Sequence, residues 1–213
     1  LSFDFWKNGI PILEEVGISL YEKGTLRNYE RSSNAHNVLQ ISEKNPEGVK
    51  WIEPVEVWSS FRTGKKPIPT NRNHGISNGW YWVNGSHDGF RHLHINHNRL
   101  IGLKLINKNL PILLIADSIY TNKKIIWQNL FHYGRNNGAL LKELNLKWHF
   151  NPDIHAQKSY SKSYTSIGFG NRVESRVLKR KGISESGKTT IISILAHKEV
   201  KIEFLDFKNK NNK

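Results

Sequence analysis

The residues best suited to chemistry lie between positions 9 and 38, in the segment GIPILEEVGISLYEKGTLRNYERSSNAHNV. Two adjacent acids, Glu14 and Glu15, are followed by a second group of functional side chains: Arg27, Tyr29, Arg31 and His36. Arginine guanidinium groups make bidentate contacts with carboxylate and sulfate, so Arg27 and Arg31 are candidates for binding an acidic ligand. The alternative is a solvated turn, or a salt bridge to Glu14, Glu22 or Glu30. His36 is compatible with a metal ligand, an acid or base, or a structural residue.

A second group of histidines comprises His87, His92, His94 and His97. His92 and His94 are expected to alternate on one face of a strand, and two such imidazoles can bind a metal. The segment FRHLHINHNR is also basic and rich in asparagine, and exposed imidazoles are ordinary in such a turn. We favour this second interpretation, in which Asp88 and Gly89 fix a turn after His87.

Gly182, Gly187, Lys188 and Thr189 match the G-x-x-x-x-G-K-T sequence motif of a phosphate-binding loop. Such a loop follows a buried strand and begins a helix. Here a highly charged segment precedes the glycines and the β-branched run TTIISIL follows them, so we expect a flexible loop and not a nucleotide site.

Consecutive aromatic residues stand at Trp80, Tyr81 and Trp82, and in a strand they must point to alternate faces. One face then belongs to the core, and the other is available for stacking against sugar rings, with Trp51 and Trp58 as further candidates. Core packing is the default expectation for large aromatic side chains in a β-sandwich.

Strand signals dominate the chain that must position these residues. A hairpin is expected over residues 1–6 and 10–16, with its turn at Lys7–Gly9. Further strands are expected at 37–42, 55–61, 79–83, 100–106, 111–118, 124–133, 147–150, 189–196 and 201–207, separated by Gly, Asn, Pro and Ser clusters. A helical turn is expected only within 137–146. The sequence predicts an all-β fold, a stacked antiparallel β-sandwich.

The net charge of +14 predicts an anionic partner: nucleic acid, an acidic membrane surface or an acidic polysaccharide. The alternative is general solubility with a basic tail containing Lys208, Lys210 and Lys213. No apolar run reaches the ~18 residues that span a bilayer. The chain has no cysteine, so it contains neither disulfides nor thiolate metal sites.

Several motifs together resemble the heparinase II/III family of polysaccharide lyases. They are Leu1-Ser2-Phe3, Asn8-Gly9, Pro11, Glu15, Gly17 and Tyr21, then Arg27, Tyr29, Arg31-Ser32-Ser33 and Ala35-His36-Asn37, and further along His87-Asp88-Gly89-Phe90, Arg99, Asp117, Tyr164 and Gly168. The run RSSNAHN is the most specific of them. The resemblance covers most of the chain and matches the carboxy-terminal β-sandwich, or super-sandwich, of the family.

The resemblance implies a lyase that cleaves a uronic-acid-containing acidic polysaccharide by β-elimination, in a cleft between an upstream α-helical toroid and the sandwich. It implies substrate contacts at Arg27, Tyr29, Arg31 and His36, and a structural zinc ion bound by Glu15 and His36. The family more often carries aspartate at the position of Glu15. No residue of this chain is assigned a catalytic role, because the family's His-x-His-Ala-Asp motif and the asparagine and tyrosine of the toroid are absent here.

We therefore expect a lyase domain over residues 1–207, a basic disordered tail over 208–213, and a chain that is a piece of a longer enzyme and inactive without the toroid. The alternative is a non-catalytic carbohydrate-binding or structural β-domain. Nucleic-acid binding ranks last because it rests on charge alone, and no membrane partner is expected. The resemblance favours a periplasmic or secreted protein, and it identifies neither the sugar nor the oligomeric state.

Overall fold

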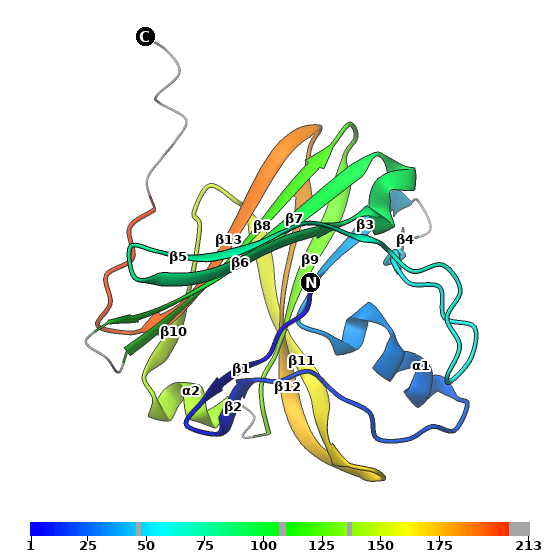
Figure 1. Cartoon of the computed structure of the whole chain (residues 1–213), viewed down its shortest axis with the longest axis horizontal. Helices are drawn as coiled ribbons and strands as arrows, with labels where there is room; N and C mark the ends of the chain where they lie inside the picture. Colours follow the sequence, from blue (N-terminus) through cyan, green and yellow to red (C-terminus); the bar gives the residue numbers. More distant parts are fainter. Residues whose placement is uncertain (46–47, 107–109, 136–137, 205–213) are drawn as a thin grey trace.

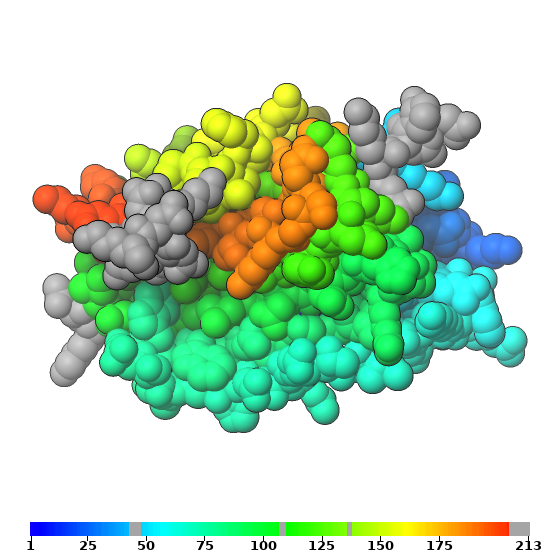
Figure 2. Space-filling view, turned by 90° about the horizontal axis from the view of Figure 1, so that it is seen from above, coloured from blue at the N-terminus to red at the C-terminus, as the bar shows by residue number. Residues whose placement is uncertain are grey.

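Two antiparallel sheets stack face to face in the computed structural model, which describes residues 1–45, 48–106, 110–135 and 138–204 (Figure 1). The six-stranded sheet has the order β10-β13-β8-β7-β6-β5, and the five-stranded sheet has the order β11-β12-β9-β3-β4. Figure 2 shows β5–β7, from teal to green, along one side of the molecule and β11, in yellow, along the opposite side. The predicted all-β sandwich is confirmed.

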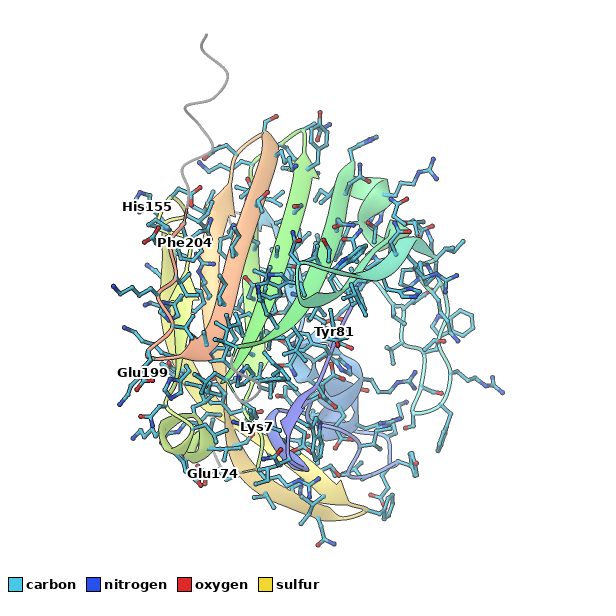
Figure 3. All side chains as sticks on the ribbon, turned by 60° about the vertical axis from the view of Figure 1, so that its left-hand side comes forward. Lys7, Tyr81, His155, Glu174, Glu199 and Phe204 are labelled. Atoms are coloured by element: carbon cyan, nitrogen blue, oxygen red, sulfur yellow. The ribbon has the colours of Figure 1, made fainter. Side chains whose placement is uncertain are left out.

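The strands of the six-stranded sheet have the following bounds: β5 Pro69–Ser77, β6 Trp80–His87, β7 Ile95–Ile106, β8 Leu110–Thr121, β10 Leu146–Phe150 and β13 Gly187–His197. The five-stranded sheet consists of β3 Leu39–Asn45, β4 Gly48–Val49, β9 Ile125–His132, β11 Ala156–Gly168 and β12 Asn171–Ser184. In Figure 3, His155 and Glu174 lie near the two ends of the β11–β12 ribbon.

The amino terminus forms the predicted hairpin, β1 Phe5–Lys7 with β2 Ile10–Leu13, and Asn8 and Gly9 both adopt positive φ in its turn. The remaining elements are short helices: α1 Thr25–Arg31, η1 Ser33–Ala35, η2 Asp88–Leu93 and α2 Ala139–Glu143. The last of these confirms the helical turn expected within 137–146. In the part of the chain that the structure describes, none of the helices could span a lipid bilayer.

The core lies between the sheets because their facing strands alternate apolar inward and polar outward. Leu113, Ile115 and Ile119 of β8 face Trp127 and Phe131 of β9, and all five side chains are buried. A polar layer interrupts this apolar core. Its centre is Asp117, which accepts hydrogen bonds from Arg99 Nε at 2.7 Å and from Asn129 Nδ2 at 2.8 Å.

Three expected elements were wrong. Residues 55–61 do not form a strand: the chain there has only an isolated bridge between Val57 and Thr63, supported by a few backbone hydrogen bonds such as Gly64 N–H to Glu56 O at 2.8 Å. Residues 201–204 carry no strand, and 205–207 lie outside the described residues, as does the predicted tail at 208–213. A helical turn was expected only within 137–146, but Thr25–Arg31 forms the helix α1.

Candidate functional site

A groove of about 550 Å³ opens between α1 and the irregular segment 55–63. In Figure 1 that segment belongs to the cyan loop that descends beside α1. One wall carries four residues that the sequence predicted for the site, and the other wall is largely apolar. The first wall comprises Glu15, Gly17, Ile18, Arg27, Glu30, Arg31 and His36, and the second comprises Val55, Val57, Ser60, Phe61 and Thr63.

Glu15 and His36 form a hydrogen-bonded pair on this groove. Two short chain segments hold them together, because Val16 N–H donates to Ala35 O at 3.1 Å. His36 Nδ1 lies 2.8 Å from Glu15 Oε2, and the two side chains are 34% and 22% exposed. The carboxylate at Nδ1 favours the tautomer that carries its proton there, which leaves the Nε2 lone pair free to accept a proton or a hydrogen bond.

The electrostatics of this pair favour an ionised Glu15. Burial opposes ionisation of its carboxyl, but the hydrogen bond and charge of His36 outweigh the burial, so the pKa of Glu15 lies below its ordinary value. The backbone N–H of Asn37 adds a further hydrogen bond to Glu15 Oε1, at 3.3 Å.

Asn37 fixes the backbone next to the Glu15–His36 pair. Its side chain is fully buried, donating to Phe3 O at 2.9 Å and accepting from His132 N–H at 2.6 Å. Its own carbonyl accepts from Arg99 Nη1 at 2.7 Å, so the backbone beside His36 is tied to the polar layer of the core. The sequence indicated Asn37 only as part of the motif. Its hydrogen-bond partners lie between 34 and 95 positions away along the chain, so the sequence did not predict them.

The donor types of Glu15 and His36 suit zinc, which takes imidazole nitrogen and carboxylate oxygen in a tetrahedral arrangement. Two ligands of such an ion lie roughly 3.4 Å apart, so a metal shared by the pair would replace the Nδ1 proton after a small rotation that lengthens the present 2.8 Å contact. The part of the chain that the structure describes brings no group of three or more His, Asp or Glu side chains together for a metal. The pair therefore supplies at most two ligands.

Arg27 is buried and pairs with the buried Glu30, whose Oε2 lies 3.6 Å from Arg27 Nη1. This is one of the salt bridges that the sequence left open. The backbone N–H of Ser19, at 2.9 Å, and the hydroxyl of Ser19 both donate hydrogen bonds to the Glu30 carboxylate. Arg27 Nη2 donates to Ser60 O at 2.9 Å, so this arginine joins the two walls of the groove.

Arg31 makes a similar connection from a more exposed position. Its guanidinium donates to Ser59 O and, at 3.4 Å, to Arg62 O. Backbone carbonyls are neutral acceptors, so the positive charge of Arg31 is not cancelled by them and remains available to an anion in the groove.

Tyr29 lies on α1 with its ring against Tyr164 of β11, the two centroids 5.8 Å apart. Burial raises the pKa of Tyr29, and the pKa of Tyr164 is also raised, chiefly by burial and then by the charge of Glu30. Tyr164 Oη donates to Glu30 Oε1 at 3.4 Å. Both phenols are therefore neutral hydrogen-bond donors at neutral pH.

Three exposed aromatic residues gather at the rim of the groove, and of these the sequence singled out only Tyr21, as part of the motif. The ring of Tyr21 lies 5.3 Å from that of Phe61 and 5.5 Å from that of Phe169, measured between centroids. Phe61 is 73% exposed and Phe169 is 68% exposed. They come from three separate loops, and no sequence pattern indicates that such loops meet.

The other sequence candidates lie elsewhere. His92 is on η2, and His94 adopts a left-handed conformation at its end, so the prediction that they share one strand face was wrong. His97 is buried, with Nε2 2.7 Å from Asp117 Oδ1. Gly182 to Thr189 spans the hairpin between β12 and β13, and no helix follows it, in agreement with the rejection of a phosphate loop.

Comparison with known proteins identifies the family of this chain and shows structures of similar fold. A family model described as Heparinase II/III-like, C-terminal, matches residues 1–199. The search of curated proteins gave no match. The chain is similar in fold to heparan sulfate lyase HepC from Pedobacter heparinus, with a TM-score of 0.63 and 13% identity over 92% of this chain. A heparinase III structure gives a TM-score of 0.59 and 15% identity over 91% of the chain. The chain spans 30% and 29% of those two proteins.

Proposed function

Since this chain belongs to the heparinase II/III-like, C-terminal family, we propose that it is the sandwich part of a polysaccharide lyase that cleaves a uronate-containing acidic polysaccharide by β-elimination. The observation that carries the proposal is the groove beside α1, where Arg31, His36 and an exposed aromatic rim border one hollow. The groove is open to one side, and in the proposed enzyme an upstream α-helical toroid completes it.

The contacts of the groove suit a polyanionic sugar chain. Arg31 offers a guanidinium to a carboxylate or sulfate group. The rim formed by Tyr21, Phe61 and Phe169 offers faces against which the apolar side of a sugar ring packs. The net charge of +14 favours the approach of a polyanion over long distances.

β-Elimination at a uronate removes the proton at C5, expels the glycosidic oxygen at C4 and leaves a double bond between the two carbons. The poorly acidic C5 proton requires stabilisation of the enolate-like charge on the carboxylate, together with proton transfer to the leaving oxygen. In our proposal Arg31 binds the polysaccharide, and the Glu15–His36 pair orients the bound polysaccharide. The base that removes the C5 proton and the acid that protonates the leaving oxygen come from the upstream part of the enzyme.

A lyase assay tests this function through the ultraviolet absorbance of unsaturated uronate ends. We compare this chain with a polypeptide extended upstream through the helical region, over a panel of acidic polysaccharides. Activity is expected only in the extended polypeptide. Arg31→Ala should then lower kcat/KM by about tenfold or more, because one charge-assisted contact is lost. Lys23→Ala, an exposed cation outside the groove lining, is the matched control.

Two results contradict the proposal. If neither polypeptide produces unsaturated ends while the polysaccharide still binds, the chain is a non-catalytic carbohydrate-binding domain. If Arg31→Ala is as active as Lys23→Ala, then Arg31 does not contact the substrate.

We also propose that the extended enzyme binds a structural zinc ion through Glu15 and His36, with its remaining ligands from outside this chain. Zinc at this position would fix the two side chains against each other beside the groove. Metal analysis should find about one zinc per extended polypeptide, and less in Glu15→Gln and His36→Ala. Absence of zinc from the unaltered extended protein refutes the proposal.

The substrate class also leads us to propose a periplasmic or secreted location, where extracellular polysaccharides are met. Fractionation of the source cells tests this: recovery of the protein with cytoplasmic markers contradicts it.

A further inference from the structure

A second groove lies on the outer face of the six-stranded sheet, formed by β5, β6, β7 and β8 and distinct from the α1 groove. Its volume is about 710 Å³. The floor consists of Trp80, Trp82, Leu100, Gly102 and Leu114, and the sides carry Asn73, Ser77, Asn78 and Asn84. The pairing register explains why these side chains share a face, since Trp82 stands opposite Gly75 on one neighbour and Gly102 on the other.

Glycines let the two tryptophan rings lie flat on the sheet. A Cβ at Gly75 would come within 2.9 Å of the Trp82 ring, and a Cβ at Gly102 within 3.1 Å of the Trp80 ring. Each indole therefore rests on the backbone of a neighbouring strand and turns its other face outward. Because successive residues of a strand alternate in direction, the rings project from the same face about 7 Å apart along β6.

The surroundings of the rings are polar and basic. Side-chain amides at Asn73 and Asn84 offer both donors and acceptors, as recognition of sugar hydroxyls requires. Lys104 Nζ lies 6.0 Å from the centroid of Trp80 and donates to Asn78 O at 3.1 Å. A cation at the end of an aromatic platform suits a sugar that carries a carboxylate.

The same outer face continues from this groove toward a neighbouring hollow of about 720 Å³ near the other end of β7. It carries two cationic side chains, Arg91 and Lys188, and the neutral Asn98. The acid on its lining, Asp88, accepts a hydrogen bond from Ile68 N–H at 2.6 Å. Cations therefore outnumber acids among the described lining residues, which complements an extended polyanion.

We propose that this outer face is a separate, non-catalytic binding site for a uronate-containing polysaccharide, with sugar rings stacked on Trp80 and Trp82. Flat indoles bordered by amides match the alternating apolar faces and hydroxyl edges of pyranose rings. The site goes beyond the proposed lyase function, because it requires neither the α1 groove nor an upstream domain. It would hold the polymer on the enzyme between cleavage events.

Polysaccharide binding to the 213-residue chain tests the site, with calorimetry on alginate and heparan sulfate and with dextran and duplex DNA for comparison. Trp80→Ala and Trp82→Ala should each weaken binding of the acidic polysaccharides by about two- to tenfold, as expected for loss of one aromatic contact. Tyr81→Ala is the matched control, because Tyr81 (Figure 3) lies between the two tryptophans, is 59% exposed and points to the opposite face.

A second measurement does not depend on how the alanine variants fold. The chain has seven tryptophans, so its NMR spectrum has one indole N–H signal for each. Saturation with alginate should shift the signals of Trp80 and Trp82, assigned with Trp80→Phe and Trp82→Phe. Unchanged signals for both, or equal affinity losses in Tyr81→Ala and the folded tryptophan variants, overturn the proposal. Tighter binding to duplex DNA than to either acidic polysaccharide also overturns it.

The Arg31→Ala variant separates this inference from the proposed function. Tryptophan-dependent binding should persist in Arg31→Ala, and it should persist if the extended polypeptide proves to have no lyase activity. Loss of all binding in Arg31→Ala, with Trp80→Ala unaffected, would place the polysaccharide in the α1 groove alone and refute the second site.

Discussion

At the scale of single residues, the site depends on what holds His36. Its imidazole is oriented by Glu15, and the backbone on either side is fixed by Ala35 O and by the buried Asn37. A histidine held in this way has one nitrogen committed to the carboxylate and the other free to accept a proton. The sequence proposed the residues, but only the fold shows that Glu15 and His36 touch.

We predict that Glu15→Gln lowers the stability of the folded chain at neutral pH and has a smaller effect in acid. The pKa of Glu15 is lowered in the folded chain, so the unfolded chain binds more protons as the pH falls below about 4.5, and the carboxylate's stabilisation is lost there. At pH 7 the variant should lose about 0.5–1.5 kcal/mol. Urea unfolding at pH 7 and pH 3 measures both values. A variant that loses as much stability relative to the unaltered chain at pH 3 as at pH 7 contradicts the prediction.

The two arginines of α1 should differ sharply in their effect on stability. Arg27→Ala leaves Glu30 buried without its cation and should cost about 3–5 kcal/mol of unfolding free energy. Arg31→Ala removes contacts to loop carbonyls at a more exposed position and should cost about 1 kcal/mol. Denaturant unfolding of both variants under one condition makes the comparison. Equal costs would show that the Arg27–Glu30 pair is not a structural anchor.

At the scale of elements, alternation of polar and apolar residues located the strands that are buried on one face. The hairpin β1–β2 and the strands β3, β8, β9 and β13 fall within or around the predicted ranges. The long strands β11 and β12 were missed, because polar and charged residues dominate both faces over much of their length. Strand β5 was missed for the same reason, since it is an exposed edge strand.

Helix α1 was missed because nothing local signals it. It has seven residues, and its N-cap Gly24 makes no side-chain capping hydrogen bond. Its stability comes from tertiary contacts made by Arg27 and Glu30, and short helices generally need such contacts. The sequence therefore predicted the charged residues of the candidate site. It predicted neither the groove wall formed by the segment 55–63 nor the aromatic rim of the groove.

The polar layer between the sheets should behave as one unit that ties β7 and β8 to β9. Asp117 accepts from Arg99, His97 and Asn129, and burial opposes its ionisation while the Arg99 charge lowers its pKa far below the usual range. Asp117→Asn leaves the buried Arg99 without its anion and should cost about 3–5 kcal/mol.

Ser118→Ala is the matched control for Asp117→Asn, because the neighbouring side chain points to the outer face of the same strand. Thermal or denaturant unfolding measures both variants. If Asp117→Asn is as stable as Ser118→Ala, the layer contributes no net stability and the two sheets depend on apolar packing alone.

At the scale of the whole molecule, three buried or half-buried histidines set how stability responds to mild acid. Burial lowers the pKa of His132 and of His87 to about 4 in each case, and it lowers the pKa of His97 as well. In the unfolded chain each histidine titrates near 6.5. Between about pH 6.5 and 4 the unfolded chain therefore takes up protons that the folded chain does not, and the free energy of unfolding must fall with pH.

His132→Gln isolates one part of this effect. Its neutral amide replaces an imidazole whose Nδ1 lies 3.1 Å from Ser163 Oγ, so the unfolded variant gains one proton fewer on acidification. The variant should lose less stability than the unaltered chain between pH 7 and pH 4.5, by on the order of 2 kcal/mol. Urea unfolding at several pH values measures the slope, with the exposed His155→Gln as control. Equal slopes in His132→Gln and the unaltered chain would mean that His132 is protonated within the folded sandwich, and the polar space around it would then have to admit a charge.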